Sequence, residues 1–191
     1  MSRRLASLLA SLLLAIVAAS AAIAQPSTPS VHPGTRLNFA ATVGPAQFVR
    51  ASSYPVGRST VYVYQYLAGR MHLSVDVYDG GRRVPAGSDN PTVISQFNEE
   101  VTAIERSLKS QGVTNFERPA VPSLCTYGAT SFRCIVMSGH IQGGGRGFSK
   151  LLLTGFRDHF VKVRADWQHS DGLTVSNADQ ALQGFVTALM R

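Results

Sequence analysis

Five histidines are the first residues with chemical potential, because an imidazole binds transition metals and transfers protons near neutral pH. No two of them have His-X-X-X-His or His-X-His spacing, and none stands at ligand distance from a cysteine. Such spacings would place two ligands on one face of a helix or strand. The sequence therefore predicts neither a bound metal nor another cofactor. The histidines are His32, His72, His140, His159 and His169.

A hydrolytic serine is not indicated either. The chain has no Gly-X-Ser-X-Gly elbow, the motif that exposes the nucleophile of α/β-hydrolases. Asp158 and His159 are adjacent, and neighbouring residues of an extended chain point to opposite sides. We therefore predict no catalytic residue. An acid–base pair assembled from separate elements is the alternative, which single motifs do not reveal.

The glycine-rich segment 143–147, Gly-Gly-Gly-Arg-Gly, has the composition of a phosphate-binding loop. A phosphate loop lies between a strand and the N-terminus of a helix, whose amide groups face the anion. Residues 148–156 instead have the composition of a strand. The glycines are therefore interpreted as a flexible hairpin loop.

Cys125 and Cys134 are the only two cysteines. An even pair in one short segment favours a disulfide if the chain reaches an oxidising compartment. The segment between them has the composition of a hairpin end, and no Cys-X-X-Cys spacing is present to lower a thiol pKa. We predict a Cys125–Cys134 disulfide, with a reactive thiol as the alternative.

Basic residues gather near the C-terminal hairpin and could contact an anionic partner. In the strand expected at 160–167, alternation places Lys162 and Arg164 on one face with Phe160 and Asp166, and the other face is apolar at 161, 163, 165 and 167. The neighbouring strand and turn add two more cations. The alternative is a solvated sheet face, partly neutralised by Asp158 and Asp166. The predicted partner-binding residues are Lys150, Arg157, Lys162 and Arg164.

Residues 1–24 are expected to be a secretory signal, because a basic start is followed by an apolar run and small residues at positions 22 and 24. Cleavage is expected after Ala24, and an uncleaved membrane anchor is the alternative. Gln25 offers no thiol for a lipid. The net charge of the full chain is +7, and loss of Arg3 and Arg4 leaves +5. After removal of the signal, no segment is long enough to span a membrane.

One domain is expected after the signal. With 45% hydrophobic and 15% charged residues, the 191-residue chain has the composition of a globular protein. Residues 25–35 are rich in Pro, Ser and Thr and are interpreted as a flexible tether. Residues 36–191 then form a single α/β domain.

Periodicity predicts strands before and after a central helix. A helix over 91–111 is bounded by Asn90 as its cap and by Gly112, and a C-terminal helix is expected to begin with Ser176 as its cap. This order favours an antiparallel sheet packed with a central and a C-terminal helix, an α+β fold. The tyrosines at 62, 64 and 66 are interpreted as a core face, with a ligand-stacking platform as the alternative. The expected strands are 47–52, 60–66, 71–78, 114–117, the cysteine hairpin running to 138, 148–156 and 160–167.

Three segments carry a resemblance to a known family: Gly57 to Gly81, Cys125 to Cys134 and Leu151 to Trp167. They resemble a family of uncharacterised secreted proteins of Gram-negative bacteria, and the likeness covers most of the chain after the signal. More distantly, the element order and the Phe-Val-Lys-Val-Arg strand at 160–164 are similar to the PsbP-like fold. That resemblance implies an antiparallel sheet sandwiched by helices and no catalytic residues.

These observations predict an exported, periplasmic or secreted, non-catalytic binding or accessory module. Its expected partner is an envelope protein or an anionic envelope surface, contacted through the basic sheet face. Nucleic acid is not expected, because no aromatic and basic recognition motif is present. The alternative function is a cell-envelope hydrolase whose site is assembled across the fold.

Overall fold

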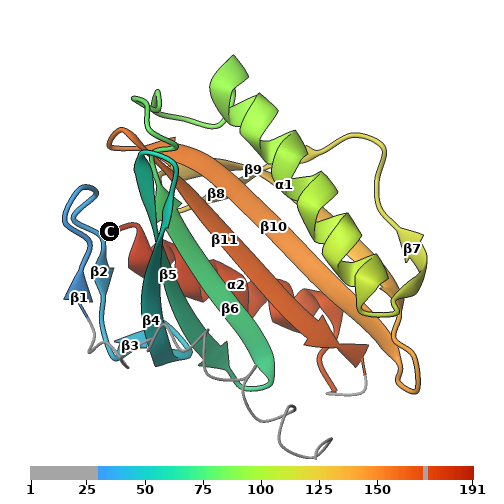
Figure 1. Ribbon diagram of the computed structural model, residues 1–191. Helices are drawn as coiled ribbons and strands as arrows, with labels where there is room; N and C mark the ends of the chain where they lie inside the picture. The colour runs from blue at the N-terminus through green and yellow to red at the C-terminus, as the bar shows by residue number, and fades with distance from the viewer. Residues whose placement is uncertain (1–29, 170–171) are drawn as a thin grey trace, which may run out of the picture.

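A nine-stranded antiparallel sheet forms the body of the molecule, in the order β3-β4-β5-β6-β11-β10-β9-β7, with β8 also paired to β9 (Figure 1). The computed structural model describes residues 30–169 and 172–191, so the expected signal and its cleavage point at Ala24 lie outside the described residues. The elements are β1 (Ser30–Val31), β2 (Asn38–Phe39), β3 (Thr42–Val43), β4 (Ala46–Val56), β5 (Ser59–Ala68), β6 (Met71–Tyr78), α1 (Pro91–Ser110), β7 (Thr114–Glu117), β8 (Ser123–Tyr127), β9 (Thr130–His140), β10 (Arg146–Phe156), β11 (His159–Gln168) and α2 (Val175–Leu189).

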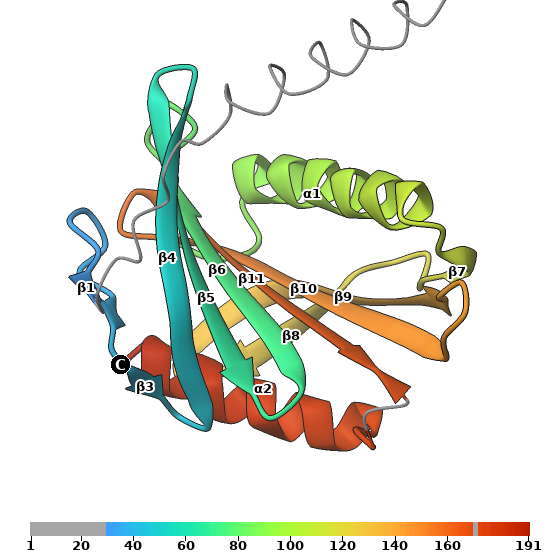
Figure 2. The same ribbon diagram turned by 60° about the horizontal axis from the view of Figure 1, so that its bottom comes forward.

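The sheet is curled into a half-barrel, and the two helices cover opposite faces (Figures 1 and 2). One core contains the buried residues of α2, together with Met71, Leu73, Val75 and Val77 of β6. The other core lies under α1. Strand alternation explains this division, because successive side chains of one strand enter different cores. The α+β fold with an antiparallel sheet, a central helix and a C-terminal helix is confirmed.

The hairpin of β5 and β6 follows the predicted pattern. Gly69, with φ of 59°, forms the turn between the strands, a left-handed conformation that glycine adopts without steric cost. Tyr64 and Tyr66 are buried in the core beneath α2, and Tyr62 packs against the same core. The tyrosines are therefore part of the core, as the preferred interpretation had it.

Helix α1 begins and ends as local signals predict. The side-chain oxygen of Asn90 accepts a hydrogen bond from the amide of Val93 at 2.9 Å, and Pro91 occupies the first turn. The helix ends at Ser110, just before Gly112, whose φ is 80°. Its apolar stripe is buried against the sheet at Val93, Phe97, Val101 and Ile104.

Helix α2 begins two residues earlier than expected. Its cap is Thr174, whose hydroxyl accepts a hydrogen bond from the amide of Asn177 at 3.1 Å, so the prediction of Ser176 as cap is wrong. Both residue types suit a cap, and the extended backbone of Thr174 decides between them. The buried residues include the four that periodicity predicts: Ala178, Leu182, Phe185 and Leu189.

The cysteine pair lies within the hairpin of β8 and β9. Cys125 and Cys134 form a disulfide, with their Cα atoms 6.0 Å apart, as predicted. Cys134 is almost fully buried, and Ser123 faces it from the neighbouring strand. In the described residues, neither helix combines the length and apolar character that a membrane crossing requires.

The folded unit begins earlier than the tether prediction placed it. Ser30 and Val31 pair with β2, within the segment expected to be flexible. His32 is 1% exposed, and its Nδ1 accepts a hydrogen bond from the amide of Thr35 at 3.0 Å. Arg157, in the turn between β10 and β11, donates to the carbonyl of Thr35 at 2.7 Å. Composition alone did not reveal these contacts.

We expect His32 to make stability depend on pH. Its burial, together with the nearby His159, lowers its pKa from 6.5 to about 4. Between these values the unfolded chain binds a proton at residue 32 and the folded chain does not, so stability falls as pH decreases from 6.5 to 4. Urea unfolding across this range should show a loss of roughly 2 kcal/mol assignable to His32.

The matched control is His32→Asn, whose side-chain oxygen replaces the acceptor Nδ1 but does not titrate. The titratable and charged groups around the site, His159, Tyr62 and Arg157, are unchanged in this variant. Its stability should decline less than that of the wild type between pH 6.5 and 4. Superimposable pH profiles of the two proteins would contradict the assignment.

Candidate ligand-binding cleft

The four predicted basic residues do not form one patch. Lys150 is opposite Ala165 in the β10–β11 register, so its side chain lies on the α2 face. There it forms an ion pair with Asp179 of α2 and lies over the ring of Tyr127, with only 7% of its side chain exposed. Arg157 lies in the turn and is bound to the N-terminal segment. Only Lys162 and Arg164 share the α1 face.

Lys162 is the centre of a buried cluster beneath α1. Its Nζ lies 2.6 Å from Oδ2 of Asp76 on β6 and 3.0 Å from Oε2 of Glu100 on α1. The Tyr78 hydroxyl donates to the other oxygen of Glu100 at 2.8 Å. The cluster therefore links α1 to β6 and β11. The ammonium group of Lys162 is bound by carboxylates of the protein itself.

Burial dominates the electrostatics of this cluster. It raises the pKa of Asp76, an effect that Lys162 partly offsets. Burial alone would lower the pKa of Lys162, but Asp76 and Glu100 raise it overall, so the ammonium form is favoured. Burial and Glu100 also raise the pKa of the Tyr78 hydroxyl, which stays protonated as a donor.

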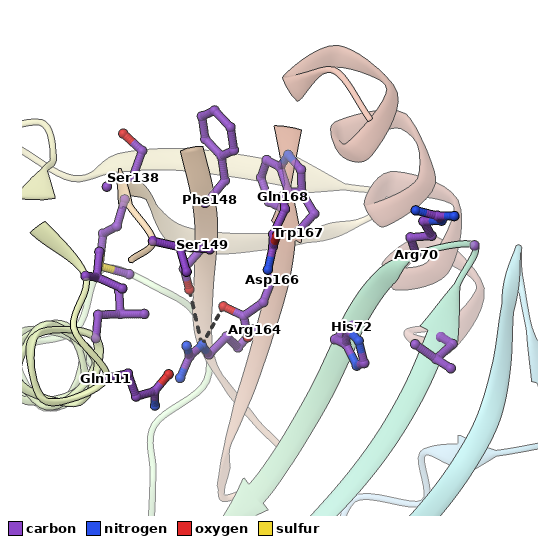
Figure 3. A pocket seen from close by; sticks show the side chains of 18 residues that line it. Arg70, His72, Gln111, Ser138, Phe148, Ser149, Arg164, Asp166, Trp167 and Gln168 are labelled. Atoms are coloured by element: carbon purple, nitrogen blue, oxygen red, sulfur yellow. Dashed lines mark hydrogen bonds and ion pairs between the residues drawn. The ribbon is translucent and has the colours of Figure 1, made fainter. Parts of the chain in front are cut away.

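A cleft of about 830 Å³ opens beside this cluster, between the C-terminal end of α1 and the sheet (Figure 3). Its floor includes Ser149, Asp166 and His72, which occupy paired positions on β10, β11 and β6. Leu108 of α1 and Gln111, the residue that caps its C-terminal end, form part of the opposite wall. The cleft thus lies where the helix ends and the strands continue beyond it.

Arg164 is the predicted site residue that lines this cleft. Its Nε donates to Oγ of Ser149 at 3.1 Å and to Oδ1 of Asp166 at 3.0 Å (Figure 3). Among the residues that the structure describes, its two terminal nitrogens have no hydrogen-bond partner. The side chain is 24% exposed. A guanidinium held by Nε in this way presents its planar fork to an oxyanion.

Ser149, Asp166 and His72 are the residue types of a serine-hydrolase triad, but their arrangement is not that of a triad. Asp166 lies between Ser149 and His72, and neighbouring strands are about 4.8 Å apart, so these two backbones are separated by about 10 Å. The hydroxyl of Ser149 contacts a guanidinium, which cannot accept its proton. General-base catalysis requires the base within hydrogen-bond reach of the nucleophile. The arrangement therefore favours holding an anion.

Sequence reasoning identified Arg164 but missed its neighbours Ser149, Asp166, His72 and Gln111 as members of one site. His72 and Asp166 are paired with each other across β6 and β11, which residue types and alternation do not show. Only the strand register contains this information. Within the described ranges, no three His, Cys, Asp or Glu side chains gather as a metal site would require.

The chain was compared with protein-family models, with curated proteins and with solved structures, and none of them matched. A fold does not specify an activity, so the function of this protein is inferred from the chemistry of the cleft.

We expect Lys162→Met to destabilise the protein by about 3 kcal/mol, because it leaves Asp76 and Glu100 buried together without a cation. The matched control is Lys109→Met, which breaks a solvent-exposed pair with Glu105 on the same helix. That change should cost less than about 1 kcal/mol. Chemical unfolding at pH 7 measures both, and equal losses would show that the buried cluster does not secure α1.

Proposed function

We propose that this protein is an exported, non-catalytic binding module that holds a small anionic ligand in the cleft between α1 and the sheet. The observation that carries the proposal is the fixed guanidinium of Arg164, with its terminal nitrogens directed to no protein partner among the described residues. A volume of about 830 Å³ lies within the range of small-molecule sites. The lining combines apolar side chains with a few polar groups, as such sites do.

A small ligand is favoured over a broad anionic surface by the distribution of charge. Lys150 and Lys162 are neutralised by carboxylates and are largely buried. Arg157 is bound to the backbone of the N-terminal segment. A flat membrane or an acidic protein face would need several exposed cations together, whereas the concave site around Arg164 suits one anionic group.

Export is supported by two independent features. The N-terminal 24 residues have the pattern of a signal, with cleavage expected after Ala24. The Cys125–Cys134 disulfide fits an oxidising compartment such as the periplasm. The resemblance to secreted proteins of Gram-negative bacteria and to the PsbP-like fold stays a prediction.

The proposal is tested with 1-anilinonaphthalene-8-sulfonate, an amphipathic organic anion whose fluorescence increases on binding. We expect the mature protein to bind it at one site, and Arg164→Gln to weaken binding about tenfold, because a charge-assisted contact is lost. The matched control is Arg83→Gln, which removes an arginine whose side chain is 86% exposed and paired with Asp158, outside the cleft. Binding that is absent, or equal in wild type and Arg164→Gln, would overturn the proposal.

A further inference from the structure

The cleft is chemically different at its two ends. At the end formed by α1 and β9, the lining includes Leu108, Val113, Met137 and Ile141. At the other end, near the turn between β5 and β6, it includes Arg70 and His72. Arg164 lies between the two ends, with Gln111 to one side and His72 to the other (Figure 3). The site therefore offers an apolar wall next to the oriented guanidinium of Arg164, with a second arginine, Arg70, at the end near the β5–β6 turn.

We propose that the ligand is an amphipathic carboxylate: a molecule with one carboxylate bound by Arg164 and an apolar chain or ring lying along the Leu108–Met137 wall. This assignment rests on the proposed function, because it specifies the ligand of the same cleft. Since Nε of Arg164 is bound to Ser149 and Asp166, the carboxylate approaches the two terminal nitrogens end-on. Two parallel N–H···O bonds then fix its orientation.

A carboxylate is favoured over a phosphate by the charges around Arg164. The carboxylate of Asp166 lies 3.0 Å from Nε of Arg164, so a dianionic ligand would experience strong repulsion at close range. The end of α1 at the cleft is its C-terminal end, because Gln111 is the C-cap. A helix C-terminus carries partial negative charge and disfavours highly charged anions. A phosphate site would instead use a helix N-terminus or several cations that meet at the anion, whereas here Arg70 lines the end of the cleft near the β5–β6 turn and the charged partner of Arg164 is the carboxylate of Asp166.

The apolar wall gives the ligand its second feature. Met137 is fully buried, and Leu108, on the last turn of α1, packs against the core beneath that helix. An alkyl chain placed against them leaves water on association, which strengthens binding roughly threefold to fourfold for each added methylene. A small hydrophilic acid would leave the partly exposed members of this wall, Leu108, Val113 and Ile141, in contact with water.

The experiment is displacement of 1-anilinonaphthalene-8-sulfonate from the mature protein by ligands that differ in one property. Hexanoate, octanoate and decanoate vary chain length, whereas octanol, octylamine and octyl phosphate vary the head group at constant chain length. We expect affinity to increase along the carboxylate series. At equal chain length, octanoate should bind at least about tenfold more tightly than octanol or octyl phosphate, and octylamine should not compete.

Two variants separate the two halves of the site. Arg164→Gln should remove the difference between octanoate and octanol while it preserves the dependence on chain length. Leu108→Gln should reduce the dependence on chain length while it preserves the preference for the carboxylate. Thermal unfolding midpoints confirm that each variant is folded. If Arg164→Gln is unfolded, Arg164→Lys, which keeps the charge but loses the fork, should bind octanoate several-fold more weakly than wild type.

The outcomes distinguish this inference from the proposed function. If the fluorescent anion binds through Arg164 but no carboxylate displaces it, or octyl phosphate displaces it better than octanoate, the ligand class is wrong and the binding module stands. If the fluorescent anion does not bind through Arg164, both proposals fail. An affinity for carboxylates that is independent of chain length would overturn the apolar half of the assignment.

Discussion

The candidate site depends on one buried cation, the ammonium group of Lys162. It contacts Asp76 on the neighbouring strand and Glu100 on α1, and thereby holds the middle of the helix above the sheet. The apolar stripe of α1 also attaches the helix to the sheet, and the ion pair adds a directional contact at one position along it. The position matters because α1 forms one wall of the cleft. The buried cluster thus determines where the wall stands relative to Arg164.

Strand β11 supplies both the core and the site, because its side chains alternate between the two faces of the sheet. Val161, Val163 and Ala165 enter the core beneath α2, while Lys162 and Arg164 face α1. A shift of one residue in the pairing of β11 would exchange these two sets. The apolar residues of β11 therefore secure the orientation of its charged residues, even though they do not touch a ligand.

Local signals predicted the elements of the fold well. The cap at Asn90, the apolar stripe of α1, the β5–β6 hairpin and the cysteine pair each depend on residues close in sequence. The site was harder to predict, because Lys150 and Arg164 were expected on one face and the register separates them. That register is set by the two-residue turn at Arg157 and Asp158, both with positive φ. Non-glycine residues rarely have positive φ, so the composition of the turn did not predict this conformation.

The charges of the Lys162 cluster and of the cleft also interact with each other. Arg164 is two residues from Lys162 on the same face of β11, and its charge favours the ionised form of Asp76. An anion bound to Arg164 neutralises that contribution and makes a charged Asp76 less favourable. Because Asp76 is a partner of Lys162, the same change weakens the electrostatic attachment of α1. Because the contribution of Arg164 is the smallest of those that act on Asp76, this effect on α1 is weaker than the direct contact between Asp76 and Lys162.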